Sequence, residues 1–287
     1  MTLHCSVLHF EFRAKDRIGF DEGKAGNTWR GGFGFALKKR FCGEKTLDAP
    51  CRCAPPCPYS RIFEPTWEGG PSGFQEPPRA FVIRAFNLDG RKFEPGEKFG
   101  FSLHLFSQDS DWRNAIQAAV GEAGAAGLGT TKARVEMTGI RAEDLSVPLH
   151  SKDNPPSRLV VEFLTPLEIK TEGRVIASPQ FGLMFRRLRD RISSILSVYQ
   201  NGSPECDFRA LAELADKITS ENVEWQQCNA TRRSMRTGQK HSIGGQIGKY
   251  ELSGDFSTIL PWLEAGVFTG VGRQTAWGKG AYRLITK

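Results

Sequence analysis

Residues 255–286 have the sequence DFSTILPWLEAGVFTGVGRQTAWGKGAYRLIT. The first part, 255–265, is predicted to form a helix that Ser253 or Asp255 caps, and AYRLIT at the end is predicted to form a strand. A glycine-rich loop joins the two. Residues 111–137, DWRNAIQAAVGEAGAAGLGTTKARVEM, show the same order of helix, glycine turn and strand. The chain is therefore predicted to contain the same kind of unit twice.

Each half also opens with a predicted strand. In residues 3–13, Leu8, Phe10 and Phe12 alternate with polar residues, which is typical of a strand with one buried face. Residues 158–169, RLVVEFLTPLEI, open the second half in the same way. The other predicted elements are helices over 29–41, 111–126, 180–198 and 207–217 and strands over 80–86, 98–107, 223–228 and 244–253. This order fits an α+β protein made of two tandem ferredoxin-like (RRM-like) domains.

The domain boundary is predicted in a polar, proline-containing stretch, PLHSKDNPPS at 148–157, which we interpret as a linker. The first domain then covers 1–147 and carries a cysteine-rich insertion at 42–79. The second domain covers 158–287 and contains the glycine-rich loop at 270–280. The chain length of 287 residues agrees with two domains, since one domain commonly has about 100–200 residues.

The composition indicates a folded, basic protein without a membrane segment. Hydrophobic residues make up 39% of the chain, which is too many for a disordered protein. No apolar run approaches ~18 residues, and the N-terminus lacks the basic and apolar segments of a signal peptide. We therefore expect a cytoplasmic protein with no membrane partner. The net charge of 39 − 32 = +7 favours a polyanion such as nucleic acid, although proteins that bind none also have this charge.

Four of the seven cysteines lie close together in the sequence. Cys42, Cys51, Cys53 and Cys57 have the spacing C-x8-C-x-C-x3-C. In a reducing compartment, four clustered thiols are more typical of a metal site than of disulfides, and Zn²⁺ bound by four thiolates is tetrahedral and closed. We therefore expect a structural zinc with no open position for a reacting water. The alternative is a set of free cysteines left from a degenerate site.

The loop before the last strand combines closely spaced glycines with two cations. Its spacing, G-x-G-x5-G-x-G, lies between a helix and a strand, so it is not a dinucleotide-binding fingerprint, which opens a helix. Without a Cβ, glycine lets backbone N–H groups approach a phosphate, and the two cations add positive charge. The alternative is a tight turn that requires positive φ angles. The predicted phosphate-binding residues are Gly270, Gly272, Arg273, Gly278, Lys279 and Gly280.

This loop resembles the glycine-rich signature of RAMP-superfamily proteins, specifically the CRISPR precursor-RNA processing endoribonucleases of the Cas6 family. Further segments resemble this family and occur in the expected order, so the resemblance covers most of the chain. These segments are 30–42 (RGGFGFALKKRFC), 57–65 (CPYSRIFEP), 78–82 (PRAFV), 161–169 (VEFLTPLEI), the helix that starts at Phe181, and 225–255.

The resemblance implies two ferredoxin-like domains that form a cleft and a ribonuclease that needs no metal or other cofactor for catalysis. In such an enzyme the RNA's own 2′-hydroxyl attacks the adjacent phosphate and leaves a 2′,3′-cyclic phosphate and a 5′-hydroxyl. The implied partners are CRISPR repeat RNA, in the form of the precursor transcript, and subunits of a CRISPR effector complex. No DNA partner is expected.

The reaction requires a base near the 2′-oxygen and cations near the phosphate. His241 ends the run RRSMRTGQKH at 232–241, which has no acid, and the adjacent cations favour its neutral, basic form. We therefore predict His241 as the base. The cations predicted to contact RNA in this run are Arg232, Arg233, Arg236 and Lys240.

The resemblance leaves the catalytic assignment open in one respect. Many members of the family have a histidine in or just after the first helix, whereas this sequence has none from residue 10 to residue 103. Some relatives act without histidine and use Lys, Arg or Tyr. The candidates near the first helix are then Arg30, Lys38, Lys39 and Tyr59.

Two rival functions remain open on the sequence alone. The first is a non-catalytic guide-RNA-binding subunit of the same superfamily, which the missing first-helix histidine favours. The second is a general zinc-containing RNA-binding protein, which would explain the cysteines and the charge but not the ordered family segments.

Overall fold

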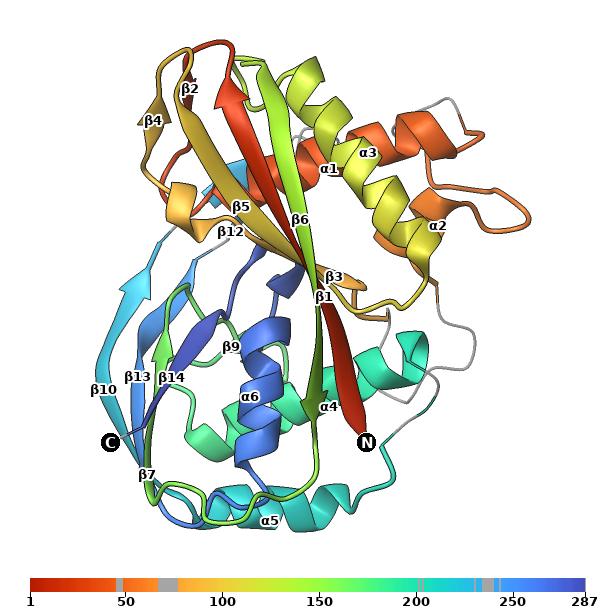
Figure 1. Ribbon diagram of the computed structural model, residues 1–287. Coiled ribbons are helices and arrows are strands. Elements are labelled where there is room, and N and C mark those ends of the chain that lie inside the picture. The colour runs from red at the N-terminus through yellow and green to blue at the C-terminus, as the bar shows by residue number, and fades with distance from the viewer. Residues whose placement is uncertain are drawn as a thin grey trace. The chain divides into compact units, whose positions relative to one another are not determined.

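The computed structural model describes residues 1–44, 49–66, 77–200, 202, 204–229, 231–233, 240–242 and 244–286. The chain divides into two compact units. The N-terminal unit consists of Ser6–Leu145, and the C-terminal unit consists of Ser146–Lys287 together with Met1–Cys5. Each unit has its own four-stranded sheet and its own helices (Figure 1).

The sheet of the N-terminal unit has the strand order β3-β5-β1-β6. Its strands are β1 (Thr2–Ala14), β3 (Phe81–Arg84), β5 (Lys98–Leu105) and β6 (Val135–Pro148). Strands β1 and β3 both run antiparallel to β5. Helices α1 (Ala25–Phe41) and α3 (Ser110–Ala126) pack against each other on one face of this sheet (Figure 1). This βαββαβ succession is the ferredoxin-like fold, which confirms the prediction for the first half.

Aromatic residues on neighbouring strands form the core of the N-terminal unit. Phe10 and Phe12 of β1 lie opposite Phe101 and Phe99 of β5, and all four are buried. Trp29 of α1 covers them, with ring centroids 4.6 Å from Phe12 and 4.4 Å from Phe101. The predicted alternation along both strands is therefore confirmed.

A short helix, α2 (Pro58–Phe63), packs closely on α1. The ring of Phe63 lies so near Gly34 that a Cβ at this position would overlap it. Gly34 is therefore needed for the close approach of the two helices. Phe63 also stacks on Phe81 of β3 (6.0 Å between centroids), so α2 joins the core.

The C-terminal unit repeats the same fold. Its sheet has the order β10-β13-β7-β14, and β7 pairs antiparallel with both β13 and β14. The strands are β7 (Arg158–Phe163), β10 (Thr219–Cys228), β13 (Gly245–Ser253) and β14 (Tyr282–Thr286). The helices are α4 (Phe181–Tyr199), α5 (Phe208–Lys217) and α6 (Leu260–Thr269). Two tandem ferredoxin-like units are therefore present, as predicted from the repeated order of elements.

Several short elements complete the two units. They are the strand pairs β2 (Ile18–Gly19) with β4 (Lys92–Phe93), β8 (Lys170–Thr171) with β9 (Arg174–Val175) and β11 (Thr231–Arg233) with β12 (Lys240–Ser242), and the 3-10 helices η1 (Phe86–Leu88) and η2 (Thr275–Trp277). Within the described part of the chain, no helix combines the length and apolar composition that crossing a membrane requires.

The last helix starts later than predicted. α6 begins at Leu260, whereas the sequence suggested a start at 255 with a cap at Ser253 or Asp255. The Asp255 carboxylate instead accepts a hydrogen bond from the backbone N–H of Ser257 (2.9 Å) and stabilises a turn. Pro261 lies in the first helical turn, where its fixed φ and missing N–H are tolerated. The predicted cap is therefore wrong.

Two other boundaries differ from the prediction because distant residues set them. Helix α1 begins at Ala25, not at 29, and the Asp89 carboxylate accepts a hydrogen bond from the backbone N–H of Ala25 (2.9 Å). Strand β7 ends at Phe163, not at 169, because the next two N–H groups, of Leu164 and Thr165, both donate to the carbonyl of Ala281. Both hydrogen-bond acceptors, Asp89 and Ala281, are more than 60 residues away in the sequence from the N–H groups that donate to them.

The connection between the two sheets is an irregular segment with several bends. Strand β6 ends at Pro148, and no helix or strand occurs in 149–157, all of which the structure describes, before β7 begins at Arg158. The first residues of β1 group with the C-terminal unit. The Gln200 side chain explains part of this grouping, because it accepts a hydrogen bond from the backbone N–H of His4 (2.9 Å) and donates one to its carbonyl (2.6 Å).

The close packing of α2 on α1 predicts opposite effects for two glycine substitutions in the same helix. Gly31→Ala should raise stability by up to about 1 kcal/mol, because alanine has the higher helix propensity and a Cβ there meets no atom within 4 Å. Gly34→Ala should lower stability by about 1–3 kcal/mol, because its Cβ overlaps the Phe63 ring. Denaturant unfolding of the two variants measures both effects, and equal shifts would contradict the packing described.

Candidate functional site

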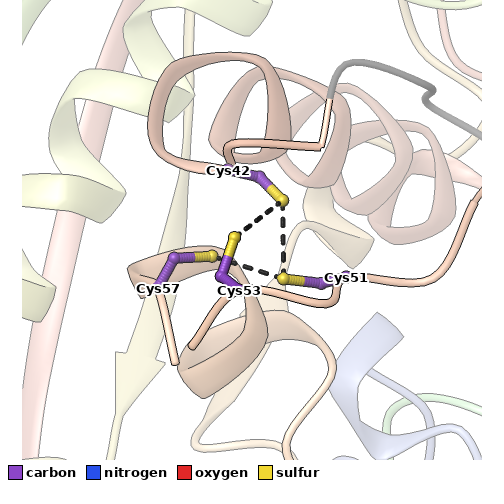
Figure 2. Close-up of side chains that lie close together, drawn as sticks. All are labelled: Cys42, Cys51, Cys53 and Cys57. Carbon is purple, nitrogen blue, oxygen red and sulfur yellow. Dashed lines mark hydrogen bonds between the residues drawn. The ribbon is translucent and has the colours of Figure 1, made fainter. Parts of the chain in front are cut away.

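The four predicted metal ligands lie together. The sulfur atoms of Cys42, Cys51, Cys53 and Cys57 are all within 4.8 Å of one another and are half-buried (Figure 2). None of the four forms a disulfide. Cys42 directly follows α1 and Cys57 directly precedes α2, so the cluster joins the end of one helix to the start of the next.

The sulfur separations agree with tetrahedral coordination. Sulfur atoms that each lie about 2.3 Å from a Zn²⁺ ion in a regular tetrahedron are about 3.8 Å apart. The Cys42 sulfur lies 3.4 Å from that of Cys51 and 3.8 Å from that of Cys53, and the sulfur atoms of Cys51 and Cys57 are 3.6 Å apart. The cluster could therefore hold a metal ion, with all four ligands from the protein.

The thiols of the cluster differ in acidity. Burial, with the neighbouring thiols adding to it, raises the pKa of Cys42 to about 12. A hydrogen bond with the backbone of Gly43 lowers the pKa of Cys53 to about 7. A metal that binds all four as thiolates must displace protons, so its affinity falls as the pH falls.

The candidate catalytic residues near α1 differ in exposure. Arg30 is half-buried, and its guanidinium carbon lies 4.4 Å from the centre of the Phe63 ring. Tyr59 is only 5% exposed, and its hydroxyl donates to Glu64 (2.8 Å). Burial, followed by this hydrogen bond, raises the pKa of Tyr59, so the phenol stays protonated. Lys39, in contrast, is exposed.

Lys38, the neighbour of Lys39, faces inward. It is buried, its ammonium donates a hydrogen bond to the carbonyl of Ala49, and it lies 5.4 Å from the centre of the Tyr59 ring. The Lys38 ammonium therefore holds the chain at Ala49, two residues before Cys51. Of the candidates on α1, Lys39 is the one most open to a ligand.

The described ends of the predicted basic run form two short paired strands, β11 and β12, which lie in the sequence between β10 and β13. Strands β11 and β12 pair antiparallel, and Arg232 lies opposite His241 while Arg233 lies opposite Lys240. The pairing therefore brings three cationic residues and the predicted base to adjacent register positions. Arg236 lies outside the described residues.

The four other histidines lie on strands or in the connection. The ring of His9 is hydrogen-bonded to Ser102 (2.8 Å) and that of His4 to Ser146 (3.1 Å). His104 is half-buried on β5, and His150 is exposed after β6.

The C-terminal glycine loop is a tight turn with positive φ angles. The values are +65° for Gly270, +84° for Gly272, +89° for Gly278 and +63° for Gly280. A Cβ at Gly280 would overlap the carbonyl oxygen of Val271. The backbone itself therefore requires glycine here, which agrees with the alternative interpretation of the motif as a tight turn.

Hydrogen bonds tie this loop to residues that follow β7. The N–H of Gly280 donates to the carbonyl of Pro166 (3.0 Å), and that of Arg273 donates to the carbonyl of Glu168 (2.9 Å). Within the loop, the N–H of Val271 donates to the carbonyl of Gly280 (3.1 Å). These three donors are used inside the protein, so in this conformation they are not directed at a ligand.

The two cations of the loop lie in different environments. The Arg273 side chain is 48% exposed and forms an ion pair with Glu168, a buried carboxylate. Lys279 is only 5% exposed. Arg273 can therefore meet a phosphate at the surface, whereas the Lys279 ammonium is inside the fold.

The arginines of α4 stabilise the C-terminal unit. Arg186 forms an ion pair with Asp216 of α5 (2.8 Å), and Arg191 donates to the carbonyl of Thr269 at the end of α6 (3.0 Å). Arg189 donates to the carbonyl of Phe208. This face is therefore built into the packing of the helices.

Sequence reasoning missed two residues near these groups. Glu168 is a buried carboxylate that pairs with Arg273, and its place beside the glycine loop depends on a turn that the sequence did not reveal. Phe35 of α1 is 48% exposed although the aromatic residues around it are buried. The sequence did offer one signal: Phe35 is four residues from Gly31 and four from Lys39, so all three lie on one face of the helix, and the lysine suggests that this face is exposed.

Two family models match the chain. A model described as an N-terminal domain matches residues 3–159. The model described as CRISPR-associated endoribonuclease Cas6 matches residues 161–282. The two matches follow the two ferredoxin-like units, and no curated protein matches the chain.

Solved structures share the fold over almost the whole chain. A Thermus thermophilus Cas6 in a product complex is 15% identical, with 99% of this chain and 100% of that chain covered and a TM-score of 0.59. A second Cas6 product complex is 14% identical, with the same coverage and TM-score. A RAMP protein that binds different RNA substrates is 16% identical, with 98% and 99% covered and a TM-score of 0.51. Residues 161–282 therefore belong to the family of the CRISPR-associated endoribonuclease Cas6, and the solved structures show that the whole chain shares the fold of Cas6 proteins.

Proposed function

We propose that this protein binds CRISPR repeat RNA and cuts the precursor transcript once within each repeat. The observation that carries the proposal is the match of a Cas6 family model to residues 161–282 in a chain with two ferredoxin-like units. Relatives of the same fold have been solved in complex with a product and with a substrate mimic, which supports RNA as the substrate class.

The cut proceeds by attack of the 2′-hydroxyl on the adjacent phosphate and leaves a 2′,3′-cyclic phosphate and a 5′-hydroxyl. No metal takes part in this step. A base must remove the 2′-proton, and cations must stabilise the charge that develops on the phosphate. We assign the base to His241, and the strand register supports this assignment because it pairs His241 with a cationic residue, Arg232.

The RNA contacts are assigned to exposed and hairpin cations. Arg273 lies at the surface of the glycine loop, and Arg233 is the register partner of Lys240 in the strand pair β11–β12. Arg236 belongs to the same basic run. Phosphate contacts by such side chains give affinity that depends strongly on salt. The glycines of the loop contribute indirectly, because they allow the positive φ angles of the turn that carries Arg273.

A non-catalytic guide-RNA-binding subunit of a CRISPR effector complex is the second candidate. The observation that favours it is the lack of any histidine between residues 10 and 103, which includes the whole of α1. Both functions use the same RNA contacts. They differ in whether the RNA is cut.

The mechanism predicts cleavage of a synthetic repeat RNA in excess EDTA. The expected products are a single cut, a 2′,3′-cyclic phosphate end and a 5′-hydroxyl end, which gel electrophoresis and mass spectrometry identify. A 2′-deoxy nucleotide at the cut site should abolish cleavage and preserve binding, because only the attacking group is removed. Strict dependence on magnesium would contradict the mechanism, and binding without any cut would support the second candidate.

His241→Ala should cut about 10²–10⁴ times more slowly than the parent with near-normal affinity for RNA, as expected for loss of a general base. His150→Ala is the matched control, because His150 is exposed in the connection after β6, and it should cut at the parental rate. Single-turnover rates and RNA affinities of both variants provide the test. A parental rate for His241→Ala would move the assignment to Arg30, Lys39 and Tyr59, of which Lys39 is exposed.

We also propose that the cysteine cluster holds one structural zinc. The sulfur separations of 3.4–3.8 Å and the four-thiol ligand set support Zn²⁺. With four protein ligands the ion would have no open position, so it would stabilise the junction of α1 and α2 and supply no water to the reaction.

The zinc proposal predicts about one zinc per chain in the purified protein, measured by elemental analysis. Cys51→Ser should lose most of the metal, whereas Cys206→Ser, which lies outside the cluster, should keep it. Acidification should release the metal, because protons compete for the thiolates. Protein that contains no zinc and whose four clustered thiols react freely in the folded state would refute the proposal.

A further inference from the structure

Helix α1 has a single exposed stripe along its middle. Gly31, Phe35 and Lys39 are exposed and follow one another at intervals of four residues, which places them on one face of the helix. Trp29 and Phe33, the two other aromatic residues in the same part of the helix, are fully buried. The stripe therefore presents one aromatic ring and one cation to the outside.

Among the described residues, Phe35 has no ring partner and Lys39 has no ion-pair partner. No carboxylate among these residues pairs with Lys39, and no aromatic ring contacts Phe35. The neighbouring cations differ in this respect, because Arg40 pairs with Glu122. A single exposed phenylalanine is common in proteins, so the exposure alone indicates nothing. The adjacent unpaired cation is the second feature that requires an explanation.

The space around the Phe35 ring is open on the side toward Gly31. Side chains of a helix lean toward its N-terminus, so the Phe35 side chain leans toward the turn that contains Gly31. A Cβ at Gly31 would meet no atom within 4 Å. Among the described residues, no side chain therefore fills the surface at Gly31, one turn before Phe35, and a flat group has room to lie there.

The charge of α1 favours an anionic ligand. The helix contains four cations and no acidic residue, and the whole chain has a net charge of +7. Four residues of helix rise about 6 Å, so an aromatic face and an ammonium lie one helical turn apart. Single-stranded nucleic acid is bound by this combination, in which a base stacks on an aromatic ring and a cation contacts the backbone phosphate.

We propose that Phe35 stacks on an unpaired base of the bound RNA and that Lys39 contacts a phosphate next to that base. The inference rests on the proposed function, because it assumes that the substrate is RNA, and it adds a positioning residue to that function. A protein partner would need a larger apolar surface than one ring flanked by glycine and lysine. The stripe has the size and chemistry of a nucleotide site.

The test uses repeat RNA that carries 2-aminopurine at one position at a time, because stacking quenches the fluorescence of this base. With the parent protein, one unpaired position should be quenched on binding. Phe35→Tyr should preserve the quenching, whereas Phe35→Leu, which keeps an apolar side chain without a ring, should abolish it. Phe35→Ala should weaken RNA affinity about 5- to 150-fold, the range expected for loss of one stacked base.

Phe86→Ala is the matched control, because Phe86 belongs to the same unit and is 37% exposed. It should keep the parental affinity and quenching. Lys39→Gln should lower the slope of log affinity against log salt by about 0.7, the value for one phosphate contact on single-stranded RNA. Thermal melting of every variant checks that the fold is kept.

Parental affinity and parental quenching with both Phe35→Ala and Phe35→Leu would overturn the inference. If the parent protein binds and cuts repeat RNA in that case, the proposed function stands and only the stacking site is wrong. If the parent protein neither binds nor cuts repeat RNA, both the proposed function and this inference are wrong.

Discussion

The close contact between α1 and α2 is the constraint that determines which side chains of α1 are buried and which are exposed. Gly34 has no side chain, and the Phe63 ring lies in the space that a Cβ would fill. This contact places Phe63 on Phe81 of the sheet and under the guanidinium of Arg30. The face of α1 that α2 covers is thereby buried, and the stripe with Phe35 and Lys39 remains exposed.

The cysteine cluster lies at the junction of these two helices. α2 has only six residues, a length that is marginal without tertiary packing. Ligands that directly follow α1 and directly precede α2 would hold the two ends together, while the buried Lys38 ammonium holds the chain at Ala49. A metal bound by all four thiols would therefore act on the geometry of α1 and would have no open position for substrate. This arrangement separates the metal from the proposed chemistry, which uses the 2′-hydroxyl of the RNA.

The C-terminal unit uses glycine for a related purpose. Gly272 and Gly280 let the loop before β14 pass close to the carbonyls of Glu168 and Val271. The same close path leaves Arg273 at the surface and Lys279 inside. In both units, therefore, a close backbone or ring approach at glycine determines which cations a ligand can reach.

The sequence predicted those helices and strands whose formation depends on the residues within them. The alternation of Phe10 and Phe12 and the helical spacing in 180–198 correspond to β1 and to α4 (Phe181–Tyr199). The start of α1 was missed because the carboxylate that accepts from its first N–H, Asp89, lies far along the chain. The burial of Tyr59 and Lys279 was missed for the same reason, since packing between distant segments sets side-chain exposure. The cysteine spacing, in contrast, was enough to predict which thiols lie together.

Hydrogen exchange before and after removal of the metal tests most directly the claim that the cysteine cluster fixes α2 on α1. The zinc-loaded protein should show protected amides in the last turn of α1 and in Pro58–Phe63, where packing and helix hydrogen bonds slow exchange. After the metal is removed, exchange in these segments should become faster, while the sheet of β1 and β5 stays protected and repeat RNA is still cut. Unchanged exchange in both helices after complete loss of the metal would contradict the account.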